Sequence, residues 1–155
     1  MNAIEGLRQM HVEAKSGFQR IEQAGSTERG SLWMKLRPEL VMHEQVEERF
    51  VYDPVAQELG SQDSLLSQWH TRHHQQVGEA ERMIGEIGRL EPSEDRWLSM
   101  VRELRMTLEK HIQTEEGEIW PRIERMWSRD KLDHAGMQIE QAKKSGSMGE
   151  ERAAA

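Results

Sequence analysis

Residues 40–54 read LVMHEQVEERFVYDP, and residues 108–121 read LEKHIQTEEGEIWP. Both stretches contain a histidine, a pair of glutamates that starts four residues later, and an aromatic residue shortly before a proline. Side chains at positions i and i+4 project from the same face of an α-helix. The chain therefore carries two copies of one helical motif, which pairs His43 with Glu47 and His111 with Glu115.

Both motifs continue stripes of apolar residues that we expect to face a protein core. The leucines that precede the two histidines on the same helical face are Leu36, Leu40, Leu104 and Leu108. A carboxylate buried without a partner is costly. Glu47 and Glu115 therefore need a compensating charge, and a bound metal cation would supply it.

The rest of the chain also favours helix, because Glu, Gln, Arg, Leu and Met dominate and no stretch alternates apolar with polar residues. We predict an all-α fold with helices over about residues 2–24, 28–59, 62–90 and onward from about residue 94. These helices would pack as an antiparallel up-down four-helix bundle. A short fifth helix is expected over about residues 130–144. Residues 1–144 would form one domain, and residues 145–155 a disordered tail.

Prolines mark breaks in this pattern, with one exception. Pro54, Pro92 and Pro121 lie near the ends of expected helices or between them. Pro38 instead falls inside the expected second helix. Because a proline removes a backbone donor and crowds the preceding turn, Pro38 indicates either a kink or a helix that begins near residue 37.

Each motif is preceded by a further histidine about one helical hairpin earlier. His11 lies 32 residues before His43, and His74 lies 37 residues before His111. A hairpin repeated twice would bring four histidines and two glutamates to one level of the bundle core. Imidazole and carboxylate ligands without sulfur suit iron, manganese or zinc, and two bridging carboxylates suit a pair of ions.

These motifs resemble those of the hemerythrin-like (HHE cation-binding) domains. The resemblance rests on LRQMH at 7–11, on ELVMH at 39–43 with Glu47 and Pro54, and on His111 with Glu115 and Pro121. It implies a four-helix bundle around a non-heme di-iron centre with an oxo or hydroxo bridge. It also implies that this centre meets O2, NO or peroxide.

Two positions in the ligand set have alternatives. The apolar stripe of the third helix centres near His70 and His73, whereas the family pattern, with an apolar residue three positions after the ligand, favours His74. We favour His74, with His70 as a fifth histidine and His73 as a neighbouring or surface residue. Glu115 is preferred to Glu116 because it continues the apolar spacing. The predicted metal ligands are His11, His43, Glu47, His70, His74, His111 and Glu115.

Composition limits the chemistry and the partners further. The 155 residues include seven histidines and no cysteine, and the formal net charge is −7. The lack of cysteine excludes disulfides and thiolate metal sites, and the acidic balance disfavours nucleic acid as a partner. No apolar run is long enough to cross a membrane, and the N-terminus lacks the pattern of a signal peptide. We expect a soluble, cytoplasmic protein.

The expected function is to bind or react with a small oxidant for sensing, handling or detoxification. Two iron ions are the expected cofactor, with manganese or zinc as the alternatives. An oxidase or oxygenase that acts on an organic substrate at the same centre is the alternative function.

Overall fold

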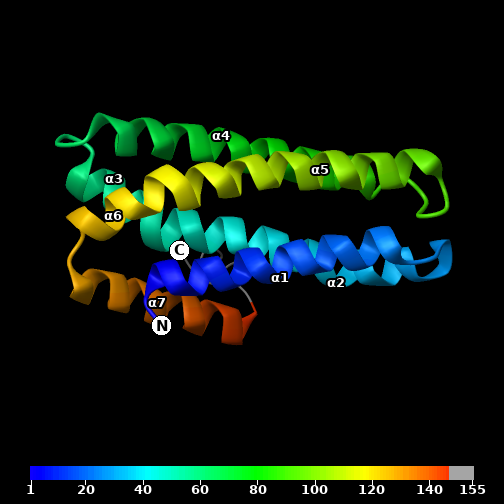
Figure 1. The fold of residues 1–155 in the computed structure, drawn as a ribbon, viewed down its shortest axis with the longest axis horizontal. Helices are drawn as coiled ribbons and strands as arrows, with labels where there is room; N and C mark the ends of the chain where they lie inside the picture. The colour runs from blue at the N-terminus through cyan, green and yellow to red at the C-terminus, as the bar shows by residue number, and fades with distance from the viewer. Residues whose placement is uncertain (147–155) are drawn as a thin grey trace.

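The structure is a computed structural model and describes residues 1–146. Four long helices form an antiparallel up-and-down bundle, as predicted (Figure 1). They are α1 (Ala3–Gln23), α2 (Ser26–Glu47), α4 (Ser64–Ile87) and α5 (Asp95–Thr114). Within residues 1–146 the elements are all helical, and no helix there is long and apolar enough to cross a membrane.

Helices α2 and α5 each pass through a five-residue π-helical turn into a shorter helix. The turn η1 (Glu48–Tyr52) leads into α3 (Asp53–Leu59), and η2 (Glu115–Ile119) leads into α6 (Trp120–Met126). A proline lies in the first turn of each following helix, and its missing N–H removes one backbone hydrogen bond where the π turn passes into the α-helix. The repeated motif of the sequence thus corresponds to a repeated backbone feature, of a kind that often marks functional sites.

Side-chain caps fix where three of the helices begin. At the start of α1 the Asn2 side chain accepts a hydrogen bond from the backbone N–H of Glu5, at 3.0 Å. Asp63 does the same for the first turn of α4, and Ser128 for α7 (Arg129–Ser145). Each side-chain oxygen satisfies an amide that has no partner inside its helix.

Helix α2 runs without interruption from Ser26 to Glu47 and includes Pro38. The alternative start near residue 37 is therefore wrong. Trp33, Leu36 and Leu40 are buried on both sides of the proline. Their packing offsets the helical hydrogen bond that the proline removes.

The apolar core consists of two clusters with a layer of buried polar side chains between them. On α1, for example, Met10 belongs to one cluster and Phe18 to the other, and the buried His11 lies between them. The same order holds on α4, where His73 lies between Trp69 and Ala80. The four long helices therefore bring their polar residues to one level of the bundle.

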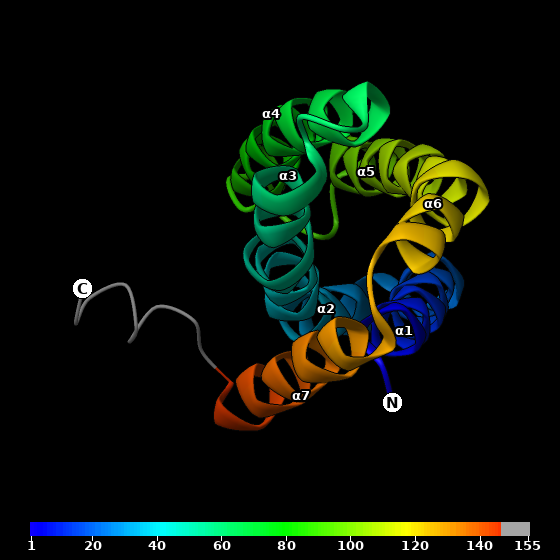
Figure 2. The same ribbon diagram turned by 90° about the vertical axis from the view of Figure 1, so that its left-hand side faces the viewer.

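Helix α7 lies outside the bundle, against α1 and α2 (Figure 2). It contacts α1 closely, because a side chain at Gly136 would collide with the backbone of Met1 and Asn2. The expected fifth helix is confirmed, and it extends through Ser145, which the sequence analysis assigned to the tail. Gly146 ends α7 in the left-handed conformation that glycine adopts easily, with a φ of 68°. The other residues of the predicted tail, 147–155, lie outside the described part.

Candidate metal centre

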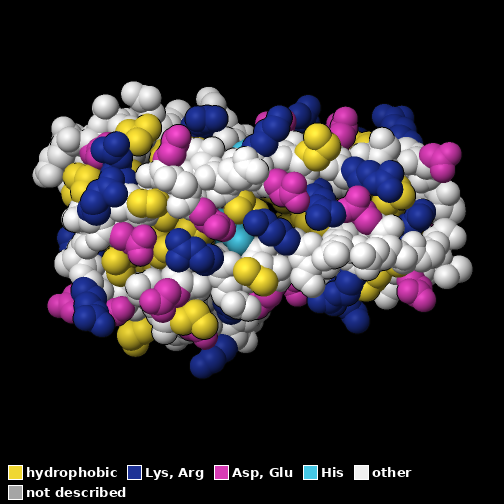
Figure 3. Space-filling model, viewed as in Figure 1, with side chains coloured by type: hydrophobic (Ala, Val, Ile, Leu, Met, Phe, Trp, Pro, Cys, Tyr) yellow, Lys and Arg dark blue, Asp and Glu magenta, His cyan; other side chains and the backbone are white. Residues whose placement is uncertain are grey.

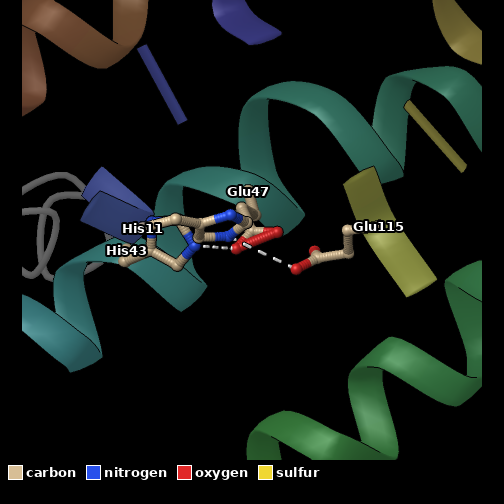
Figure 4. A group of neighbouring side chains, drawn as sticks. All are labelled: His11, His43, Glu47 and Glu115. Carbon is tan, nitrogen blue, oxygen red and sulfur yellow. Dashed lines mark ion pairs between the residues drawn. The ribbon is translucent and has the colours of Figure 1, made fainter. Parts of the chain in front are cut away.

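Four buried side chains from α1, α2 and η2 meet in the polar layer (Figure 4). His11, His43, Glu47 and Glu115 each offer one ligand atom, and these atoms all lie within 4.8 Å of one another. His43 Nε2 contacts a carboxylate oxygen of Glu47, and His11 Nε2 lies 3.5 Å from Glu115 Oε1. All four were predicted as ligands from the sequence, and the fold brings them together.

A second group lies beside the first and shares one residue with it. Glu44, Glu47 and His73 also offer ligand atoms that lie within 4.8 Å of one another. His73 Nε2 is 3.1 Å from Glu44 Oε2 and 3.8 Å from Glu47 Oε2. Because Glu47 belongs to both groups, the layer has the composition of a two-ion site with a shared carboxylate.

The three histidines of α4 lie differently from the order preferred in the sequence analysis. His73 is buried, with 1% of its side chain exposed, whereas the His74 side chain is 78% exposed and pairs with Glu48. His70 is partly exposed and lies 2.6 Å from Asp53. Neither His70 nor His74 joins the two groups, whereas His73 does. The apolar stripe indicated His73, and the motif spacing pointed to the adjacent residue.

His111 lies at the edge of the same layer. It lines a cavity together with His11, His43 and Glu115, although it is less buried than these three. Burial lowers the pKa of His111, so its ring favours the neutral form that a metal ligand requires.

Many polar atoms of the layer have no hydrogen-bond partner among the described residues. They are His11 Nε2, His43 Nδ1, both oxygens of Glu47 and both ring nitrogens of His73. The close contacts between these histidines and glutamates lack the alignment of a hydrogen bond. Unpartnered polar atoms are rare in a protein interior because each costs about 1–3 kcal/mol. A cation bound among them would remove that cost, so the donor set fits a metal ion.

Without a bound cation, burial and the neighbouring charges leave the candidate ligands in mixed protonation states. Burial, followed by the charge of Glu115, raises the pKa of Glu47 well above its usual value. Burial lowers the pKa of His43 to about 3. Burial opposes charge on His73 as well, but the contacts with Glu44 and Glu48 outweigh it and raise the pKa of His73 to about 9. A cation would favour the ionised glutamates and the neutral imidazoles.

Tyr52 also contacts this layer, and the sequence analysis did not predict it as a site residue. Its hydroxyl donates a hydrogen bond to Glu115 Oε2 at 2.5 Å and accepts one from Trp120 Nε1 at 2.8 Å. Burial and the nearby carboxylates raise the pKa of Tyr52 well above its usual value, so it stays a donor. The π turn η1 contains one more residue per turn than an α-helix, and this extra residue changes the direction in which the Tyr52 side chain projects. A spacing of 3.6 residues per turn, as in an ideal α-helix, therefore does not predict the position of Tyr52.

Two more side chains orient His11. Its Nδ1 lies 2.7 Å from Glu116 Oε2, and its ring stacks on Trp120 with the ring centres 4.7 Å apart. A carboxylate at Nδ1 holds the proton there and leaves Nε2 free to bind a metal. Glu116 is thus the outer neighbour of a candidate ligand, while Glu115 lies in the cluster.

A small cavity adjoins the layer between α1 and α5. Its volume is about 20 Å³, which is room for about one water molecule, and Lys15 and Arg105 contribute to its walls. Figure 3 shows a histidine side chain at the bottom of a hollow between these two helices. The candidate centre therefore has a narrow approach from the surface.

The chain belongs to the hemerythrin HHE cation-binding domain family, whose model matches residues 2–128. It is 26% identical, over 135 residues, to an uncharacterized hemerythrin-like protein of Schizosaccharomyces pombe. That match covers 86% of this chain but only 65% of the length of the relative. The fold is similar to that of a hemerythrin HHE cation-binding domain-containing protein from Mycobacterium kansasii, with a TM-score of 0.74 and 24% identity. This match covers 94% of this chain and 87% of the crystal structure.

Proposed function

We propose that this protein holds two iron ions in its polar layer and binds or reacts with a small oxidant, namely O2, peroxide or NO. The observation that carries the proposal is the set of buried imidazole and carboxylate atoms without hydrogen-bond partners within residues 1–146. His73 takes the place of His74 and His70 in the ligand set. The proposed ligands are His11, His43, Glu47, His73, His111 and Glu115.

The iron pair, when bound, would supply the electrons for oxidant chemistry, and the side chains around it would hold the ligands in place. Glu116 keeps the proton of His11 on Nδ1, and Trp120 restricts the orientation of the same ring. Tyr52 holds one oxygen of Glu115 through its hydroxyl. Pre-oriented ligands bind a metal more tightly because less conformational freedom is lost on binding.

The size of the adjoining cavity supports a small oxidant. Room for about one water molecule suits a diatomic molecule or peroxide, and it is too little for a carbon skeleton. Lys15 and Arg105 line this cavity together with candidate ligands such as His11 and Glu115.

Metal analysis combined with an optical spectrum tests the proposal. Protein loaded with ferrous iron without oxygen should bind two irons per chain, and O2 or peroxide should then produce the near-ultraviolet band of a bridged di-iron centre. Binding of fewer than two irons would contradict the proposal. Binding of two manganese or zinc ions in preference to iron would support the site but not the oxidant chemistry.

A wider groove favours a second candidate function, the oxidation of an organic substrate. It measures about 290 Å³, lies between α1, α2 and the end of α7, and is lined by Met10, Met42 and His43. Iron-loaded protein would then consume O2 in step with an apolar organic compound. Met42→Trp, which fills the groove, should slow that reaction and leave peroxide consumption unchanged; equal rates in both proteins would contradict this candidate.

A further inference from the structure

We propose that the groove between α1, α2 and the end of α7 binds a narrow apolar molecule that ends in a carboxylate, and that Lys143 pairs with this carboxylate. His43 forms part of the groove wall, so a molecule held there would lie beside the candidate metal centre. The site gives the second candidate function a class of substrate. A reaction of the bound molecule would rest on the proposed iron pair, whereas its binding would not.

The groove has the size and the walls of a site for a small organic molecule. Its volume of about 290 Å³ is close to the lower end of the range of about 300–1,000 Å³ that is typical of ligand sites. Met10 and Met42 line it, and their flexible thioether side chains adapt to the shape of an apolar ligand. Ala14 has a small side chain, which leaves room between α1 and α2. The walls therefore suit an apolar chain.

Lys143 is a half-buried cation in the wall of this groove, and its charge lacks a counter-charge. Within residues 1–146 its ammonium makes no ion pair or hydrogen bond, whereas Lys131 on the same helix lies 2.7 Å from Glu58. The buried Ala142 fixes the rotation of α7 at this point and so holds Lys143 at the groove. A carboxylate on the ligand would supply the missing partner through a charge-assisted hydrogen bond.

Two glutamates, Glu13 and Glu39, also line the groove, but both are exposed to solvent. Water and salt weaken the field of an exposed charge more than that of a half-buried one. Lys143 is the less exposed of these charges, and its positive charge is one of those that oppose protonation of His43, so it lies near that ring. Next to His43 the groove therefore favours an anionic head group over an ammonium group.

Octanoate is a suitable probe because it joins an apolar chain to a single carboxylate. Calorimetric titration of the full chain, both metal-free and loaded with ferrous iron without oxygen, should show one octanoate bound per chain. Octanol and octylammonium, which have the same chain with a neutral or a positive head group, should bind more weakly.

Lys143→Gln tests the charge pair, with Lys144→Gln as its matched control. Lys143→Gln should raise the Kd for octanoate about fivefold or more and leave the Kd for octanol unchanged. Lys144 is the next residue of α7, but it is exposed and does not line the groove. Its variant makes the same change in net charge, so it should bind octanoate as wild type does.

Met42→Trp tests the groove itself, since the larger side chain fills it and should abolish octanoate binding. Octanoate binding at wild-type affinity in Met42→Trp, equal effects of the two lysine variants, or tighter binding of octylammonium than of octanoate would overturn the inference. Two irons bound to a wild-type chain that does not bind octanoate would overturn this site alone. Octanoate binding by a chain that takes up fewer than two irons would support this site and overturn the proposed function.

Discussion

His73 and His74 are neighbours in sequence, yet one is buried beside Glu44 and Glu47 and the other faces solvent. Successive residues of an α-helix are about 100° apart around its axis. One step along α4 is therefore enough to move an imidazole from the polar layer to the surface. The family motif predicted a buried histidine on α4, but at His74 instead of His73. An error of one residue therefore placed an exposed side chain in the core.

Alanine variants of the two histidines should differ sharply in metal binding. In His73→Ala the affinity for one ion should fall sharply. The loss should exceed the ~10–100-fold that follows when a residue hydrogen-bonded to a ligand is removed. His74→Ala is the matched control and should bind two ions as wild type does, because its side chain lies outside the cluster. Metal analysis after anaerobic loading measures both; loss of metal from the His74 variant alone would contradict the assignment.

Tyr52 should contribute to stability through its hydroxyl. Tyr52→Phe leaves the Trp120 N–H without its acceptor and removes a donor from Glu115. The loss of these buried hydrogen bonds should lower the free energy of unfolding by about 1–3 kcal/mol. Urea denaturation of the metal-free protein measures the effect, and an unchanged midpoint would show that the hydroxyl adds no stability.

At the scale of the element, one side chain both begins α4 and joins it to α6. Asp63 accepts hydrogen bonds from the backbone amides of Leu65 and Leu66, and its other oxygen lies 2.9 Å from Arg122. Burial opposes the charge of Asp63, but Arg122 and these amides outweigh it and hold its pKa below its usual value of 3.8. The ionised form therefore stabilises the fold.

Asp63→Ala should lower the free energy of unfolding by about 0.5–2 kcal/mol at neutral pH, because the cap is lost. Since the pKa is lower in the folded state, the contribution of the charge is fully present above about pH 4 and is lost as the pH falls through the folded pKa. Asp63→Asn keeps an acceptor for the cap, so it should be the milder variant. Its stability should also depend less on pH in this acidic range, and denaturation curves between about pH 2 and 6 test both expectations.

The two π turns show how a sequence repeat becomes a repeat of structure. Glu47 immediately precedes η1 and Glu115 begins η2, and each turn is followed by a helix with proline in its first turn. The second half of each motif, an aromatic residue near a proline, thus coincides with the π turn that ends a helix with candidate ligands. Tyr52 and Trp120, the two aromatic residues, hydrogen-bond to each other across the bundle.

At the scale of the whole molecule, the polar layer connects all four long helices between two apolar clusters. Metal binding should therefore stabilise the entire bundle. At a free ion concentration one hundred times the dissociation constant, one site adds about 2.7 kcal/mol, which corresponds to a rise in Tm of roughly 5–10 °C. Thermal unfolding with ferrous iron, and again with a strong chelator, measures this difference.

Glu47→Gln is the control for that experiment. Burial and Glu115 disfavour the charge of Glu47 in the metal-free protein, so the variant should unfold at the same temperature as metal-free wild type or above it. Because Glu47 belongs to both ligand groups, the same variant should lose most of the rise in Tm with iron. Equal Tm values for wild type with iron and with chelator would contradict a metal-stabilised bundle.

The periodicity of the sequence determined the helices and their antiparallel order. It also determined the level of the bundle at which the candidate ligands meet, because burial of an apolar stripe constrains every residue on that stripe. These residues are His11, His43, Glu47 and Glu115. Only the tertiary structure decided which other side chains lie beside these residues. It selected His73 over His74 through the rotation of α4, and it brought Tyr52 to Glu115 through a π turn that no regular helical spacing predicts. It also placed Glu44 beside His73. Such contacts between helices depend on how the helices are rotated and packed against one another, and short sequence motifs do not encode this rotation.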